Sequence, residues 1–187
     1  MIVMAKALVR PYKGNSLLNM PRDFVVIDIE TTGLKPGVNE IIEIGAIKVK
    51  DMEIIDTFQT LIKPRFLIPS FITAFTGITD DMVANAPPVS EVLPLFLSFV
   101  NQQILVGHNV NFDINFIYES LMSELTLPLV NDFVDTMRIS RKKLKGAPNY
   151  KLETLSHYFN INTEDNHRAL KDCWMTFYVY QALMNLN

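Results

Sequence analysis

Two carboxylates stand two residues apart in a strongly apolar segment of the chain. The other members of the segment 24–30, which contains Asp28 and Glu30, are apolar and mostly β-branched, and Thr31 and Gly33 end the run. Such a run predicts a buried strand, on which residues two apart point to the same face. Buried like charges repel each other unless a cation neutralises them, and oxygen ligands suit Mg²⁺ or Mn²⁺. The pair therefore indicates a divalent-metal site, although a single acid at a strand end is more often simply solvated.

Two later segments add further acids and a histidine. Asp113 lies in the first turn of an expected helix, where the helix dipole favours a negative charge. His167 and Asp172 are five residues apart, about 500° of helical rotation, so they share one site only if His167 lies on the loop or the first turn. Each has an ordinary alternative, as a helix-start acid or a surface histidine. Together, four carboxylates and one histidine from three segments make the inventory of a two-metal phosphodiester hydrolase.

The hydrophobic pattern indicates the elements that position these side chains. Strands over 41–49 and 54–62 follow the first strand so closely that an antiparallel meander is expected. The remaining pattern predicts a short strand over 104–107 and helices over 69–76, 90–100 with Ser90 as N-cap, 112–125, 136–145, 151–158 and 167–184. Strands first, then helices alternating with short strands, favour an α/β fold with a mixed sheet flanked by helices.

The N-terminal residues differ from the rest of the chain. Residues 1–22 show no sustained hydrophobic period, and they contain four basic residues and no acid. We predict an N-terminal arm over 1–22, followed by one catalytic domain over 23–187.

Composition sets limits on the class of protein. The chain has 187 residues, of which 49% are hydrophobic and 20% charged, a globular profile. No apolar run reaches the roughly 18 residues that a membrane span needs, so no membrane partner is expected. A single cysteine, Cys173, excludes an internal disulfide and favours the cytoplasm. The net charge of −3 is unusual for a nucleic-acid binder, but metal-binding carboxylates account for surplus acid, and bound metals attract phosphate.

Three motifs carry a resemblance to a known family. The segments 28–34 (DIETTGL), 108–113 (HNVNFD) and 167–172 (HRALKD) resemble, in order, the three motifs of the DEDDh, or DnaQ-like, 3′–5′ exonucleases. Stretches 75–79 (FTGIT) and 150–155 (YKLETL) are also similar to this family. The resemblance covers about residues 23–184 and is nearest to the proofreading exonucleases of bacterial DNA polymerase III, either the epsilon subunit or the exonuclease domain of PolC-type polymerases. Asn111 and Lys171 depart from the usual residues of the motifs.

The resemblance implies a fold and a set of residue roles. It implies an RNase H-like fold with a five-stranded mixed sheet. It also implies that Asp28, Glu30 and Asp172 bind the first of two Mg²⁺ or Mn²⁺ ions, that Asp28 bridges to the second, and that Asp113 binds directly or through water. His167 would take the proton of the attacking water. The residues that would approach the terminal nucleotide are Thr31, Leu34, Thr76, His108 and Phe112.

These roles lead to an expected function with two alternatives. We expect a 3′–5′ exodeoxyribonuclease that releases nucleoside 5′-monophosphates from single-stranded or frayed 3′ ends of DNA, with a replicative polymerase as partner. The first alternative is an RNase T-like or oligoribonuclease-like exoribonuclease, because nothing in the sequence reads a 2′-hydroxyl. The second is an inactive nucleic-acid-binding module that keeps the fold.

Overall fold

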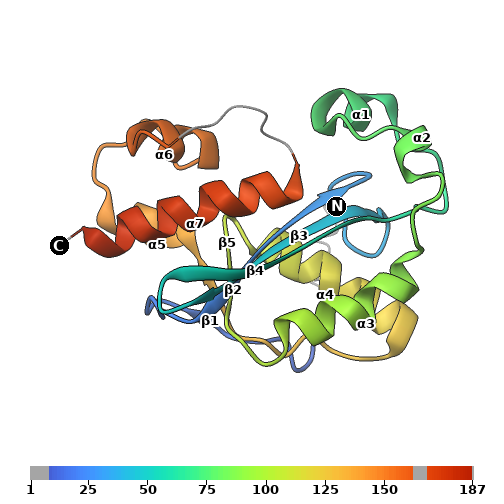
Figure 1. Ribbon diagram of the computed structural model, residues 1–187, viewed down its shortest axis with the longest axis horizontal. Helices are drawn as coiled ribbons and strands as arrows, with labels where there is room; N and C mark the ends of the chain where they lie inside the picture. The colour runs from blue at the N-terminus through green and yellow to red at the C-terminus, as the bar shows by residue number, and fades with distance from the viewer. Residues whose placement is uncertain (1–8, 162–167, 187) are drawn as a thin grey trace, which may run out of the picture.

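A six-stranded mixed sheet forms the centre of the computed structural model, which describes residues 9–161 and 168–186 (Figure 1). Along the sheet, the strands follow the order β1 (Ser16–Leu17), β6 (Phe133–Asp135), β5 (Leu105–Gly107), β2 (Phe24–Thr31), β3 (Ile41–Lys50) and β4 (Glu53–Leu61). The helices are α1 (Ser70–Thr76), α2 (Asp80–Val83), α3 (Val89–Val100), α4 (Asn111–Leu125), α5 (Thr136–Lys143), α6 (Leu152–Tyr158) and α7 (Ala169–Asn185). The expected α/β class is confirmed.

Strand β2 lies where the two halves of the sheet meet. It pairs antiparallel with β3, which pairs antiparallel with β4, so the expected meander is confirmed. On its other side β2 pairs in parallel with β5, and β5 and β6 continue the parallel half. In this register Asp28 lies opposite Gly45 and Glu30 lies opposite Glu43.

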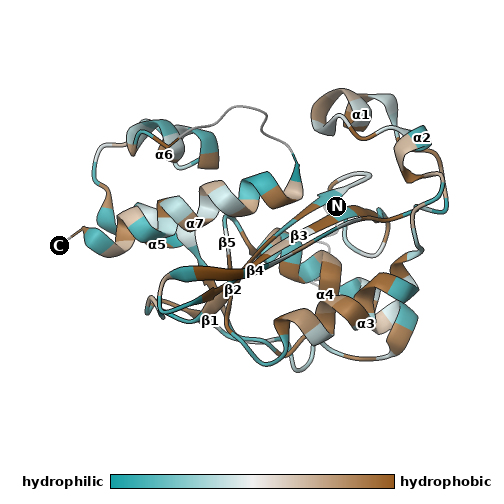
Figure 2. Ribbon diagram, viewed as in Figure 1, coloured by the Kyte–Doolittle hydropathy of each residue, from teal (hydrophilic) through white to brown (hydrophobic). Residues whose placement is uncertain are grey.

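Both faces of β2 are buried, each against a different group of helices. Val25, Ile27 and Ile29 pack in one core with residues of α3 and α4. Phe24 and Val26 point the other way and pack in a second core with residues of α5, α6 and α7. Figure 2 shows hydrophobic residues along α3, α4 and the central strands. A strand that is covered on both faces has a nearly continuous apolar sequence, which explains the pattern of segment 24–30.

Several details differ from the sequence expectations. The sheet has six strands, not five, and neither β1, β6 nor α2 was expected. Ser90 is not the N-cap of α3; the helix begins one residue earlier, with Pro88 at the cap position and no side-chain cap. Pro88 has the extended conformation typical of an N-cap residue, and its carbonyl accepts the first backbone hydrogen bonds of the helix, from Glu91 and Val92.

Part of the expected arm lies against the sheet. β1 comes from this segment and pairs in parallel with β6, extended by a bond from the Phe133 N–H to the Asn15 carbonyl at 2.9 Å. The hydroxyl groups of Tyr118 and Tyr180 donate to the carbonyls of Pro11 and Pro21. The division of the chain at residue 22 therefore remains a prediction. Within the described residues, no helix is long and apolar enough to cross a membrane.

Candidate active site

Three of the expected carboxylates meet above the C-terminal half of β2. Asp28 and Glu30 leave the same face of the strand, and Asp172 comes from the first turn of α7. Each offers one carboxylate oxygen, and these atoms all lie within 4.8 Å of one another. This is the arrangement that the two-residue spacing on a strand predicts for Asp28 and Glu30.

A glycine allows α7 to reach the sheet at this point. Gly45 of β3 is the partner of Asp28, and a Cβ atom at Gly45 would lie only 2.4 Å from the backbone nitrogen of Leu170. The same Cβ would lie 2.5 Å from the carbonyl carbon of Ala169. The missing side chain thus lets the start of α7 lie directly on β3, which brings Asp172 over Asp28 and Glu30.

Asp113 approaches the same strand from the other side of the sheet. It is buried in the first turn of α4, and its carboxylate accepts a hydrogen bond of 3.1 Å from the N–H of Ile29. Within the described pairing, β5 reaches β2 only at Val25 and Val26, so a later N–H of β2 that points away from β3, such as that of Ile29, needs another acceptor. Asp113 meets that need next to the carboxylate trio, although it is not one of the three whose oxygens converge.

The electrostatics of the site favour a bound cation. Burial first, and then the nearby charges of Asp113 and Asp172, raise the pKa of Asp28 well above its ordinary value. Burial and the charge of Asp172 raise the pKa of Glu30 to about 8, and burial raises the pKa of Asp113 to about 8. These acids cannot all be ionised near neutral pH without a compensating positive charge. A donor set made only of carboxylate oxygens fits a hard divalent cation such as Mg²⁺ or Mn²⁺.

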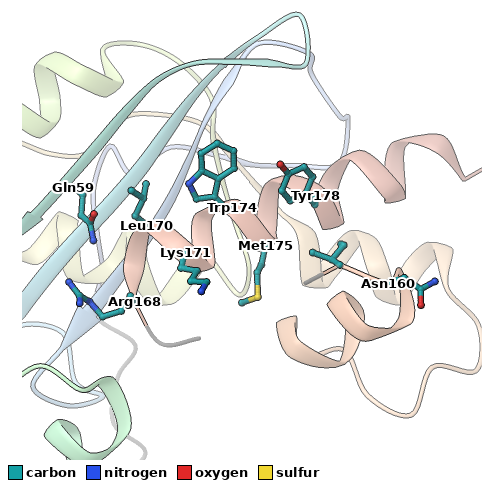
Figure 3. A pocket seen from close by; sticks show the side chains of 9 residues that line it. Gln59, Asn160, Arg168, Leu170, Lys171, Trp174, Met175 and Tyr178 are labelled. Carbon is teal, nitrogen blue, oxygen red and sulfur yellow. The ribbon is translucent and has the colours of Figure 1, made fainter. Parts of the chain in front are cut away.

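A cavity of about 350 Å³ opens over the three carboxylates. Its lining includes every residue that was expected to approach the terminal nucleotide, namely Thr31, Leu34, Thr76, His108 and Phe112. A larger hollow of about 810 Å³ lies beside α7, where Trp174, Met175 and Tyr178 line it (Figure 3). That hollow contains none of the converging carboxylates, so the smaller cavity is the better candidate for the chemistry.

The lining residues divide into braced polar groups and exposed apolar ones. The Thr31 hydroxyl donates to the Gly33 carbonyl at 2.6 Å, and the Thr76 hydroxyl donates to the Ile72 carbonyl at 3.0 Å. Leu34 is 80% exposed, and Phe112 packs against Phe116 with ring centroids 4.8 Å apart. The apolar members can pack against a sugar or base without reading its sequence.

His108 is fixed by the fold through both ring nitrogens. Nε2 lies 2.8 Å from the Tyr150 carbonyl, to which it donates, and Nδ1 lies 2.8 Å from the Thr136 hydroxyl. Burial lowers the pKa of His108, which favours the neutral ring. Both ring nitrogens are therefore engaged by the protein, and through them His108 joins the end of β5 to the start of α5 and to the segment before α6.

One expected residue lies outside the described part of the chain, and one important residue was not expected. His167 belongs to segment 162–167, so its role stays a prediction. Glu43 was missed, although it is fully buried on β3 opposite Glu30 and forms an ion pair with Arg168. The only sequence signal was one acid inside the apolar run 41–44.

Comparisons with known proteins give a consistent result for the sequence. A family model described as exonuclease matches residues 25–180. The chain is 45% identical over 171 residues to a PolC-type DNA polymerase III of Caldanaerobacter subterraneus subsp. tengcongensis, a match that covers 91% of this chain and 12% of that protein. It is 38% identical over 161 residues to the DNA polymerase III epsilon subunit of Aquifex aeolicus, a match that covers 86% of this chain and 80% of the relative. The chain thus spans about 12% of the PolC-type relative but most of the epsilon subunit.

Solved structures show the same similarity in three dimensions. Exonuclease X in complex with a 5′-overhanging duplex DNA matches with a TM-score of 0.70 and 28% identity, over 87% of this chain and 91% of that one. Exonuclease I of E. coli with a dT13 oligonucleotide matches with a TM-score of 0.77 and 19% identity, over 89% of this chain and 42% of that one.

Proposed function

Because this chain belongs to the exonuclease family, whose model matches residues 25–180, we propose that it removes nucleoside 5′-monophosphates one at a time from the 3′ ends of DNA. The fold is the RNase H-like fold of this family. The observation that carries the proposal is the convergence of Asp28, Glu30 and Asp172 within 4.8 Å at a cavity lined by Leu34 and Phe112.

The residues of the site would have separate roles in phosphodiester hydrolysis. Asp28, Glu30 and Asp172, with Asp113 beside them, would hold two divalent ions. Such ions supply a more acidic water and neutralise negative charge at the scissile phosphate. His167 would accept the proton of the attacking water, a task that an unperturbed histidine pKa near 6.5 suits at neutral pH. Leu34 and Phe112 would hold the terminal nucleoside without selecting its base.

The choice of DNA as substrate rests on the relatives. The similar PolC-type and epsilon proteins are named as parts of DNA polymerase III, and the similar exonucleases I and X were solved with DNA. A replicative polymerase is accordingly the proposed partner, and the cytoplasm the proposed location. Removal of misincorporated nucleotides is the role that this combination supports best.

The test uses two oligonucleotides of one sequence, one DNA and one RNA, each labelled at the 5′ end. With Mg²⁺ or Mn²⁺ we expect a ladder that shortens from the 3′ end on DNA, and no cleavage with chelator. The matched variants are Asp28→Asn, in the carboxylate trio, and Asp56→Asn, an exposed acid on β4. Only Asp28→Asn should abolish cleavage. Faster cleavage of RNA than of DNA would show that RNA is the substrate. No cleavage product with either metal ion would support the alternative that the protein is an inactive nucleic-acid-binding module.

A further inference from the structure

A buried carboxylate that the proposed chemistry does not use lies directly beside the metal-site residues. Glu43 is 0% exposed and occupies the position on β3 that pairs with Glu30 on β2. In an antiparallel pair, opposite residues project from the same face of the sheet with Cβ atoms roughly 5 Å apart. A buried charge at this place needs compensation, or it would be strongly destabilising.

Arg168 provides that compensation through a two-pronged contact. Its Nη2 donates to Oε1 of Glu43 at 2.8 Å, and its Nε donates to Oε2 at 3.1 Å. The side-chain amide of Gln59 on β4 donates to Oε1 at 2.8 Å. A planar guanidinium that meets a carboxylate with two nitrogens fixes orientation as well as distance, which a lysine ammonium group does not.

The same carboxylate also holds the first backbone group of α7. The N–H of Ala169 donates to Oε2 of Glu43 at 3.1 Å. The first N–H groups of a helix lack partners within the helix, and α7 has no side-chain cap from its own N-cap residue, Arg168. Glu43 therefore acts as a cap supplied from the sheet, and it ties the start of α7 to β3 through both a side chain and a backbone group.

The start of α7 determines where the third carboxylate lies. The N–H of Asp172 donates to the Arg168 carbonyl at 3.0 Å, so the two residues belong to one rigid turn. Arg168 also directly follows His167 in the sequence, so its backbone nitrogen is the attachment point of that residue. A shift of Arg168 would therefore move Asp172 relative to Asp28 and would move the attachment point of the expected general base.

We propose that Glu43 and Arg168 are a positioning pair for the exonuclease reaction: their ion pair fixes the start of α7, and with it Asp172 and the attachment point of His167. Neither residue lines the cavity over the three carboxylates. The inference rests on the proposed function, because it assigns the pair to the placement of that site.

The test separates positioning from simple stabilisation by measuring kcat, KM for DNA and Tm for three variants. Arg168→Met removes the charge, Arg168→Lys keeps the charge without the two-pronged contact, and Glu43→Gln keeps the shape without the charge. A displacement of about 1 Å in a reacting group can cost about 100-fold in rate. We expect kcat to fall about 10- to 100-fold in Arg168→Met and Glu43→Gln, with KM within about threefold of wild type. Arg168→Lys should retain an intermediate kcat.

A double variant and a second ion pair serve as controls. Glu43→Gln/Arg168→Met should lose no more kcat than the worse single variant, because a pair that acts as one unit is removed only once. The control pair is Arg65 and Glu40, joined at 2.7 Å outside the catalytic cavity. Arg65→Lys and Glu40→Gln should leave kcat within about twofold of wild type.

Mn²⁺ binding followed by electron paramagnetic resonance gives a readout that does not need nuclease activity. Displacement of Asp172 should weaken Mn²⁺ binding about fivefold or more in Arg168→Met. Folded Arg168 variants with wild-type kcat and Mn²⁺ affinity and only a lower Tm would overturn the positioning role. A wild-type protein that binds Mn²⁺ but cleaves no DNA would instead overturn the proposed function, while the variants' Mn²⁺ affinities would still decide the positioning of Asp172.

Discussion

Glu30 and Asp113 are placed where an ionised carboxyl group is unfavourable in the absence of a cation. Burial and neighbouring acids raise the pKa of each to about 8. The guanidinium of Arg168 acts in the opposite direction on the pKa of Glu30, but it is already bound to Glu43. The site therefore lowers the stability of the metal-free protein, and a bound ion would offset this cost by binding the folded state alone.

The raised pKa values predict that the metal-free protein becomes less stable as pH rises. The folded-state pKa of Glu30 is raised from its ordinary 4.5 to about 8, so the folded state holds this proton more tightly than the unfolded state. Between these two pH values the unfolded state binds fewer protons, and the free energy of unfolding falls as pH rises. In chelator, we expect Tm to fall from pH 5 to pH 8, and Mn²⁺ should raise Tm more at pH 8 than at pH 5.

Asp28→Asn provides the matching control for this titration. The substitution removes one buried charge from the group, so the metal-free variant should be at least as stable as the wild type at pH 8 and should gain little from Mn²⁺. Differential scanning fluorimetry across the pH series measures both effects. Parallel Tm profiles for the two proteins in chelator would contradict this account of the carboxylates.

His167 is the expected acceptor of the proton from the attacking water. Loss of a general base typically lowers the rate about 10²- to 10⁴-fold. We expect His167→Ala to lose kcat in this range, with unchanged Tm and unchanged Mn²⁺ affinity, since the residue is not among the expected metal ligands. His157→Ala, a histidine exposed on α6, is the control and should keep wild-type kcat. Near-normal turnover by His167→Ala would remove this residue from the mechanism.

Strands and helices with a long hydrophobic period could be predicted from the sequence. Elements and contacts that depend on residues distant in the sequence could not. The strand that carries Asp28 and Glu30 and the helix that carries Asp172 follow from local pattern. β1 has two residues and β6 has three, which is too few to show a hydrophobic period. β1 forms because its backbone pairs with the edge of β6, a strand more than 100 residues later in the sequence. Glu43 was missed for a related reason: its partner Arg168 is 125 residues away, and no local pattern connects them.

The packing of α7 on β3 gives a prediction for Gly45. A Cβ atom would lie 2.4 Å from the Leu170 nitrogen, and backbone atoms cannot move aside as a flexible side chain can. We expect Gly45→Ala to displace the start of α7, to cost about 1–3 kcal/mol of stability, and to lower kcat at least tenfold. Denaturant unfolding and steady-state kinetics measure the two effects.

Gly146→Ala separates this close contact from general glycine strain. Gly146 has a φ of +90°, but a Cβ atom there would meet nothing within 4 Å. This variant should lose some stability through backbone strain and should keep its kcat. Wild-type kcat in Gly45→Ala would show that α7 can shift without disturbing Asp172.

At the scale of the whole molecule, a protein with a net charge of −3 must still guide a polyanion to an acidic site. Basic residues gather on α5 and the residues after it, namely Arg138, Arg141, Lys142, Lys143 and Lys145. This segment adjoins the cavity, because His108 contacts both Thr136 at the start of α5 and the Tyr150 carbonyl. Three of the five have structural contacts: Arg138 donates to the Ser16 hydroxyl, Arg141 lies over the Tyr150 ring at 6.0 Å from its centroid, and Lys143 donates to the Leu183 and Leu186 carbonyls near the end of α7.

Lys142 and Lys145 are exposed and are therefore the residues to test for contact with the upstream strand. Each phosphate contact with a single strand contributes roughly 0.7 to the slope of log K against log salt concentration. We expect Lys142→Gln/Lys145→Gln to reduce the magnitude of this slope by about 1.4, measured by fluorescence anisotropy with labelled single-stranded DNA in the Asp28→Asn background.

The control for this test changes the net charge equally at the far end of the central strands. Arg22 and Lys50 are exposed near the turn between β3 and β4, and the register places that turn at the opposite end of β2 from Glu30. Arg22→Gln/Lys50→Gln should leave the slope unchanged if the effect is a local phosphate contact. Equal slopes for the two double variants and the parent would make the basic segment an ordinary solvated surface. Equal reductions in both would attribute the effect to net charge and not to a path for the DNA.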